Sequence, residues 1–62
     1  MTAAHPLVSV LIPNWNGAAH LPTCFRALER QTYPRLEVIL IDNASTDESV
    51  SLTRQQFPWV KI

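Results

Sequence analysis

The sequence has few cysteines, no excess of charge of one sign and no long hydrophobic run. It contains 62 residues with one cysteine and one glycine, and its five basic residues balance five acidic ones. The single cysteine, Cys24, permits no internal disulfide, and balanced charge argues against binding nucleic acid or anionic membrane by bulk charge. The apolar run 7–12 is far too short to cross a bilayer, and no basic signal region precedes it. We therefore expect one small cytoplasmic domain that binds no nucleic acid.

The first part of the chain alternates between strand and helix patterns. Segments 7–12 and 36–41 are nearly continuous apolar runs, which is typical of strands buried on both faces of a parallel sheet. Pro22 and Pro34 limit the segment between them to a helix from about residue 20 or 21 to 31 or 32. Apolar residues recur there at helical spacing and predict its buried face: Leu21, Cys24, Phe25 and Leu28.

The second part of the chain repeats this alternation. Ser45 and Glu48 have the spacing of a capping box, which predicts that Ser45 caps a helix from about residue 46 to 56. Segment 59–62 then predicts the beginning of a third strand. This order is typical of parallel βαβ units with right-handed crossovers. We therefore expect an α/β fold, a truncated β-α-β-α-β parallel sheet, with residues 1–6 as an N-terminal tail and 7–62 as the folded part.

Two polar clusters follow the first two predicted strands. They are residues 13–17, PNWNG, and 42–45, DNAS. Neighbouring parallel strands bring such clusters to one edge of the sheet, where α/β proteins bind ligands. Trp15 offers a ring on which a planar base can stack, and Asp42 stands where an acid bonds a ribose hydroxyl in dinucleotide-binding folds. Glycine-rich phosphate loops are missing, so the sequence predicts a base and ribose site without a phosphate cradle.

Structural roles explain the same residues equally simply. Trp15 could cover the edge of the core, and the Asp42 side chain could serve only a turn. These alternatives remain open on the residues alone.

Several separated motifs together resemble the start of a family 2 glycosyltransferase. They are residues 8–17 (VSVLIPNWNG), the apolar positions of the first helix, residues 31–34 (QTYP) and residues 37–49 (EVILIDNASTDES). The family more often has tyrosine at the position of Trp15, but the stacking surface is retained. The resemblance implies a GT-A fold and a donor nucleotide site formed by Pro13, Asn14, Trp15, Asn16, Asp42 and Asn43.

The resemblance also implies an activity. A parent enzyme would transfer a sugar from a UDP-, dTDP- or GDP-sugar to a saccharide or lipid-linked acceptor, as in cell-wall or polysaccharide biosynthesis. The family's divalent metal, manganese or magnesium, and its catalytic base would be held by residues downstream. We therefore expect an N-terminal fragment that has no catalytic or metal residues and is inactive alone, with the parent cytoplasmic or at the inner face of the membrane.

Two other interpretations compete with this one. The chain could be a truncated βαβ piece without catalytic function. It could instead belong to another nucleotide-binding α/β domain, such as a nucleotidyltransferase or a dehydrogenase that lacks its fingerprint.

Overall fold

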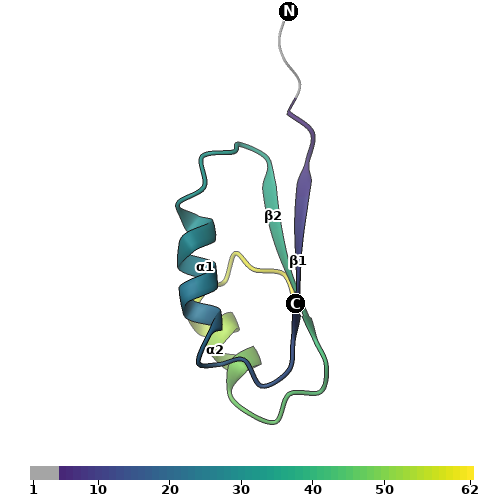
Figure 1. The fold of residues 1–62 in the computed structure, drawn as a ribbon, viewed down its shortest axis with the longest axis vertical. Coiled ribbons are helices and arrows are strands. Elements are labelled where there is room, and N and C mark those ends of the chain that lie inside the picture. The colour runs from purple at the N-terminus through teal and green to yellow at the C-terminus, as the bar shows by residue number, and fades with distance from the viewer. Residues whose placement is uncertain (1–4) are drawn as a thin grey trace, which may run out of the picture.

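The fold is a two-stranded parallel sheet with two helices (Figure 1). The computed structural model describes residues 5–62, so residues 1–4 of the predicted tail lie outside the described part. The elements follow the order β1 (Val8–Asn14), α1 (Leu21–Glu29), β2 (Leu36–Asp42) and α2 (Ser49–Gln56). Val8 lies opposite Leu36, and Asn14 lies opposite Asp42. The predicted α/β class is confirmed, and the arrangement is consistent with the beginning of a GT-A, Rossmann-like fold.

The predicted third strand is present only as one parallel bridge, between Ile39 and Lys61. The Leu40 N–H donates to the Lys61 carbonyl at 2.6 Å, and the Lys61 N–H donates to the Val38 carbonyl at 2.9 Å. Since β1 pairs with the other side of β2, β2 lies in the middle of this small sheet.

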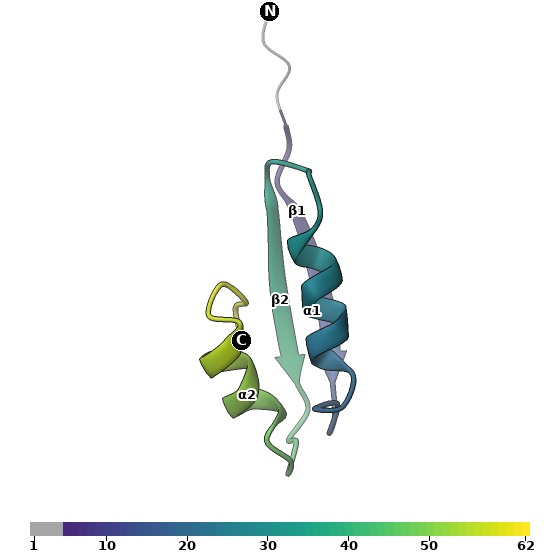
Figure 2. The same ribbon diagram turned by 90° about the vertical axis from the view of Figure 1, so that its left-hand side faces the viewer.

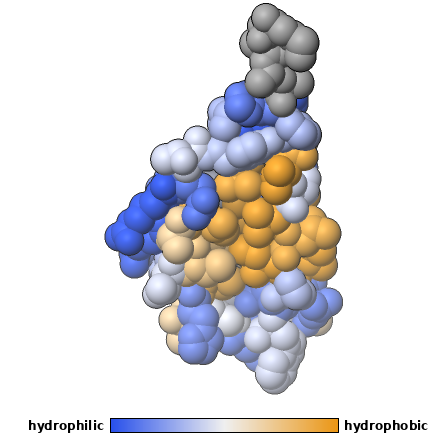
Figure 3. Space-filling view, turned by 45° about the horizontal axis from the view of Figure 1, so that its top comes forward, coloured by the Kyte–Doolittle hydropathy of each residue, from blue (hydrophilic) through white to orange (hydrophobic). Residues whose placement is uncertain are grey.

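Both helices cover the same face of the sheet (Figures 1 and 2). Strand side chains alternate accordingly: Val38 and Leu40 are almost fully buried, whereas Leu11 is 58% exposed and Ile41 is 45% exposed. The prediction that both strands are buried on both faces is therefore wrong for this chain, because described elements cover only one face. Figure 3 shows apolar side chains gathered on the side of the molecule where the strands lie. The core consists of Leu21, Phe25, Val38, Leu40, Phe57 and Val60.

Helix α1 packs through Leu21 and Phe25, and the Phe25 ring lies 5.0 Å from that of Phe57. Cys24 is exposed, so its predicted place in the core is wrong: the helix turns Phe25 toward the sheet and leaves its neighbour outside the contact. The helix also ends earlier than predicted. The N–H groups of Arg30 and Gln31 bond carbonyls three residues back, which tightens the last turn beyond Glu29. Within residues 5–62, neither helix is long and apolar enough to cross a bilayer.

Helix α2 begins at Ser49, three residues later than predicted, and Ser45 does not cap it. The Asp47 carboxylate instead accepts the Ser49 N–H at 3.0 Å, while the Ser45 hydroxyl donates to Asp42 at 2.6 Å. The predicted capping box is therefore wrong, because the carboxylate at the end of β2 takes the hydroxyl that the pattern assigned to the helix.

Candidate functional site

The loops that follow β1 and β2 meet at one end of the sheet, the lower end in Figure 1. The register of the strands causes this, since Asn14 and Asp42 end them as direct neighbours. The Asn43 N–H donates to the Asn14 carbonyl at 2.8 Å and continues the pairing into the loops. The predicted site residues 13–16 and 42–43 are thereby brought together.

Three of the predicted residues offer side chains to solvent at this end. Pro13, Trp15 and Asn43 are exposed, and Trp15 is 70% exposed. An indole so far from the core contributes little to packing, which argues against the alternative that Trp15 only covers the core edge. A planar partner could reach its face.

The Asn14 side chain, by contrast, is buried beneath the loops. Its amide nitrogen lies 2.9 Å from Asp42 Oδ1, 3.1 Å from Ser45 Oγ and 3.0 Å from Ser49 Oγ. An amide nitrogen carries two hydrogens, so these three acceptors share them. This amide is directed at protein groups rather than outward at a ligand.

The Asp42 carboxylate is half-buried and accepts hydrogen bonds on both oxygens. Oδ1 accepts from the Ser45 hydroxyl at 2.6 Å and from Asn14, and Oδ2 accepts from the Ser45 N–H at 3.0 Å. These bonds, led by the Ser45 hydroxyl, hold the pKa of Asp42 below its usual range. At neutral pH the group is therefore an ionised acceptor held in a fixed orientation.

The Asn16 side chain joins the first loop to the second. Its Oδ1 accepts the N–H groups of Thr46 at 2.7 Å and Asp47 at 3.2 Å, and its own N–H donates to Ser45 Oγ at 2.9 Å. Asn16 has a φ of 51°, a left-handed conformation that asparagine tolerates better than most residues. The Asp47 carboxylate completes the connection by accepting the Ala18 N–H at 3.1 Å.

Gly17 leaves room for the Asn14 amide. A Cβ placed on Gly17 would lie 2.2 Å from Asn14 Oδ1, far inside van der Waals contact. Its φ is not positive, so the backbone conformation does not require glycine. The close approach of the Asn14 side chain is the physical reason for a glycine at this position.

Sequence reasoning missed the structural members of this network. Ser45 and Ser49 both contact the Asn14 amide, and Asp47 accepts from the Ser49 hydroxyl. The hydrogen bond from the Ser49 hydroxyl is the main reason that the pKa of Asp47 lies below its usual range. The available signal was the spacing of Ser45 and Ser49 after Asp42, the residue that ends a strand. That spacing could have indicated a hydrogen-bond network, but Ser45 also fits a helix cap.

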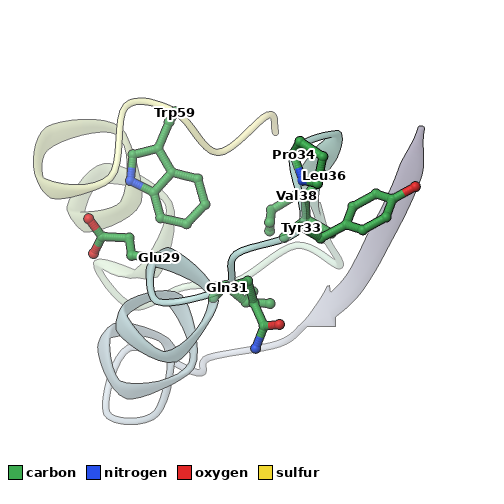
Figure 4. A pocket seen from close by; sticks show the side chains of 8 residues that line it. Glu29, Gln31, Tyr33, Pro34, Leu36, Val38 and Trp59 are labelled. Atoms are coloured by element: carbon green, nitrogen blue, oxygen red, sulfur yellow. The ribbon is translucent and has the colours of Figure 1, made fainter. Parts of the chain in front are cut away.

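A hollow lies toward the opposite end of the sheet, between α1 and the beginning of β2 (Figure 4). It has a volume of about 310 Å³. Trp59 and Glu29 lie along one side of it, while Tyr33 turns outward and donates its hydroxyl to the Pro6 carbonyl. Its described lining has a carboxylate and no basic side chain, so it is unsuited to an anionic nucleotide: Leu28, Glu29, Gln31, Tyr33, Pro34, Leu36, Val38 and Trp59.

The comparisons with known proteins agree with one another. The sequence pattern of glycosyl transferase family 2 matches residues 9–61. The chain is similar to the glycosyltransferase AglE of Haloferax volcanii, with 42% identity over 89% of the chain and 19% of the relative. A PGL/p-HBAD biosynthesis glycosyltransferase of Mycobacterium bovis is 43% identical over 79% of the chain and 19% of its own length.

A third relative has no assigned substrate in its name. It is the uncharacterized glycosyltransferase YibD of Escherichia coli, 36% identical over 89% of the chain and 17% of the relative. The chain thus spans about a fifth of the length of the curated relatives it matches. No solved structure matches it. The family match decides against the dehydrogenase and nucleotidyltransferase interpretations. The chain belongs to glycosyl transferase family 2.

Proposed function

We propose that these residues form the donor-nucleotide part of a larger glycosyltransferase. The observation that carries the proposal is that an exposed indole, Trp15, and an oriented, ionised carboxylate, Asp42, both lie at the carboxyl ends of two adjacent parallel strands. The base would stack on Trp15 beside Pro13, and Asp42 would accept a hydrogen bond from the base edge or a ribose hydroxyl. Asn43 lies at the same rim, and Asn16 shapes the first loop.

The reaction would be sugar transfer from a UDP-, dTDP- or GDP-sugar to a saccharide or lipid-linked acceptor. A hydroxyl oxygen of the acceptor forms a bond to the anomeric carbon, and the bond from that carbon to the diphosphate oxygen breaks. The nucleoside diphosphate leaves, and the hydroxyl proton passes to a general base. We place that base outside this chain, because the carboxylates at this end have lowered pKa values and are poor proton acceptors near neutral pH.

The residues at this end do not fit a divalent metal site. Among residues 5–62 there is no group of three or more histidine, cysteine or acidic side chains that could hold an ion. Both oxygens of Asp42 and of Asp47 already accept hydrogen bonds from the protein. We therefore propose that any manganese or magnesium ion that assists the diphosphate is held by residues outside this chain.

Replacing Asp42 with alanine in the full-length protein should weaken nucleotide binding by roughly tenfold or more, because the protein loses a charged group that accepts a hydrogen bond from the nucleotide. Calorimetric titration with UDP, dTDP and GDP measures this. Glu29→Ala is the matched control, since it removes an exposed carboxylate on α1 away from the site and should leave the affinity unchanged. Equal affinities of wild type and Asp42→Ala would remove Asp42 from the site, and absence of nucleotide binding by the wild type would overturn the proposed function.

The 62-residue chain alone should transfer no sugar from any of these donors, with or without manganese or magnesium. The physical reason is that the two carboxylates at the proposed site, Asp42 and Asp47, have lowered pKa values, and that the described residues form no group that could hold a metal ion. Release of nucleoside diphosphate by the purified polypeptide is the measurement, with the full-length protein as the positive control. Reproducible turnover would place catalytic groups within the chain.

A further inference from the structure

We propose that Asn14 is a positioning residue for donor binding, whose buried amide fixes the Asp42 carboxylate for the nucleotide. The inference rests on the proposed function, because it assumes that Asp42 contacts the donor. It adds a residue that acts through another residue rather than through the ligand. The Asn14 amide nitrogen is 2.9 Å from Asp42 Oδ1 and is buried behind it.

The orientation of the amide follows from the chemistry of its neighbours. A carboxylate can only accept hydrogen bonds, so the Asn14 side chain must present its NH₂ group to Asp42. The reverse orientation would place the amide oxygen against a carboxylate, which is repulsive. Gly17 lies on the oxygen side of the amide, where a Cβ would clash with Asn14 Oδ1. The three acceptors on the nitrogen side therefore favour one of the amide's two flips, and the glycine leaves room for the amide oxygen on the other side.

The same amide connects Asp42 with the beginning of α2. Ser49 Oγ lies 3.0 Å from the Asn14 nitrogen and donates its own proton to the Asp47 carboxylate. Asn14 thus donates directly to the Asp42 carboxylate and is connected through the Ser49 hydroxyl to the Asp47 carboxylate. These donors lie between two negative charges that repel each other. A neutral donor is what this position requires: an apolar residue would leave Asp42 with fewer donors, and an acid would add a third negative charge.

The decisive variant is Asn14→Asp, which keeps the shape and replaces the donor by a second carboxylate. At neutral pH the two carboxylates repel, and we expect about tenfold weaker binding of whichever of UDP, dTDP or GDP the wild type binds. On acidification the pair takes up one proton at an apparent pKa raised by the repulsion. The protonated carboxyl then donates to Asp42 as the amide did, so binding should recover as the pH falls.

The wild type should show no such recovery. Its Asp42 stays ionised between about pH 8 and pH 5 because its pKa is lowered. The terminal phosphate of the ligand titrates at about pH 6, so each variant is compared with the wild type at the same pH and the recovery is read from that ratio. Asn14→Ala removes the donor without adding charge, and its affinity should be about fivefold weaker at every pH in that range. Gln55→Glu is the charge control, because it makes the same chemical change at an exposed position on α2 and should match the wild type.

The experiment is a calorimetric titration of the full-length variants at several pH values, with thermal unfolding of each variant as a check of folding. Weak binding of Asn14→Asp at neutral pH that recovers in acid supports the proposal. Wild-type affinity in Asn14→Asp and Asn14→Ala at all pH values overturns it while leaving the proposed function intact. If Asn14→Asp does not fold, Asn14→Ala decides: weaker binding by a folded variant supports the proposal, and unchanged binding overturns it. A wild type that binds no nucleotide fails the proposed function instead.

Discussion

Replacing Gly17 with alanine in the full-length protein is expected to destabilise the fold by about 1–3 kcal/mol, the usual cost of forcing extra volume into a packed site. The new Cβ would lie 2.2 Å from Asn14 Oδ1 and 3.7 Å from Leu21 Cγ, so the main conflict is with the amide. The amide cannot simply move aside, because its nitrogen is bonded to three side chains. Nucleotide binding should weaken together with stability, since Asp42 loses its positioning donor.

A double-mutant cycle separates this clash from a general effect on the loop. In a background that carries Asn14→Ala, the atom that meets the new Cβ is gone, so Gly17→Ala should cost little more. Denaturant unfolding of the wild type, both single variants and the double variant gives the coupling free energy. Ala19→Ser is a control at an exposed position in the same loop and should behave like the wild type.

Two outcomes would contradict the expectation. A Gly17→Ala variant of wild-type stability would show that the loop relaxes around the methyl group. An equal cost of Gly17→Ala in both backgrounds would show that the loop backbone, rather than the Asn14 amide, requires glycine at this position.

The ends of several elements were predictable where a simple local signal, an apolar run or a proline, marked them. The apolar runs placed both strands within two residues of their observed ends, and the prolines bounded α1 at its beginning. The prediction that Cys24 lies in the core was wrong, because helical spacing of apolar residues does not show how much of that helix face the neighbouring elements cover. The burial of strands on both faces failed for a related reason: an apolar run reports what a strand can bury, and the described chain supplies helices to only one face.

The position of the site was predictable from the sequence, but its hydrogen-bond network was not. Strand order places residues 13–16 beside residues 42–43, and this follows from parallel pairing alone. Which polar group bonds which is decided by competition among neighbours. Ser45 could cap a helix or bond a carboxylate, and the sequence does not rank these options, whereas the fold brings Asp42 within 2.6 Å of its hydroxyl. Gly17 likewise has a role only once the Asn14 side chain is placed.

One polar row crosses the face of the sheet that the helices leave uncovered. The Glu37 carboxylate accepts from Ser9 on β1 at 2.5 Å and from the Lys61 ammonium at 2.6 Å. The bond from Lys61, followed by that from Ser9, lowers the pKa of Glu37. Charged groups on a sheet face oppose non-specific pairing with other chains. Each strand contributes only one residue to this row, however. Farther along the strands on the same face, Leu11 and Ile41 are apolar and exposed.

The 62-residue chain on its own is therefore expected not to form a stable monomer. Its core is a single small cluster, and chains of this size have net stabilities near zero unless disulfides, metals or partners add to them. Its one cysteine forms no disulfide, and its outer strand β1 pairs on one side only among the described elements. Two exposed apolar strand positions, Leu11 and Ile41, lie on the uncovered face and favour association between chains.

Circular dichroism during heating, combined with size-exclusion chromatography, tests this expectation. We expect a broad, non-cooperative melt and elution as aggregates. The variant Leu11→Lys/Ile41→Glu, which changes only the uncovered face, should shift the chain toward the monomer without producing a sharp transition, because the core is unchanged. A matched change in the core, Leu40→Ala, should not improve solubility. A sharp cooperative transition from a monomeric peak of the unaltered chain would contradict the prediction and would mean that one covered face of this sheet suffices for a folded domain.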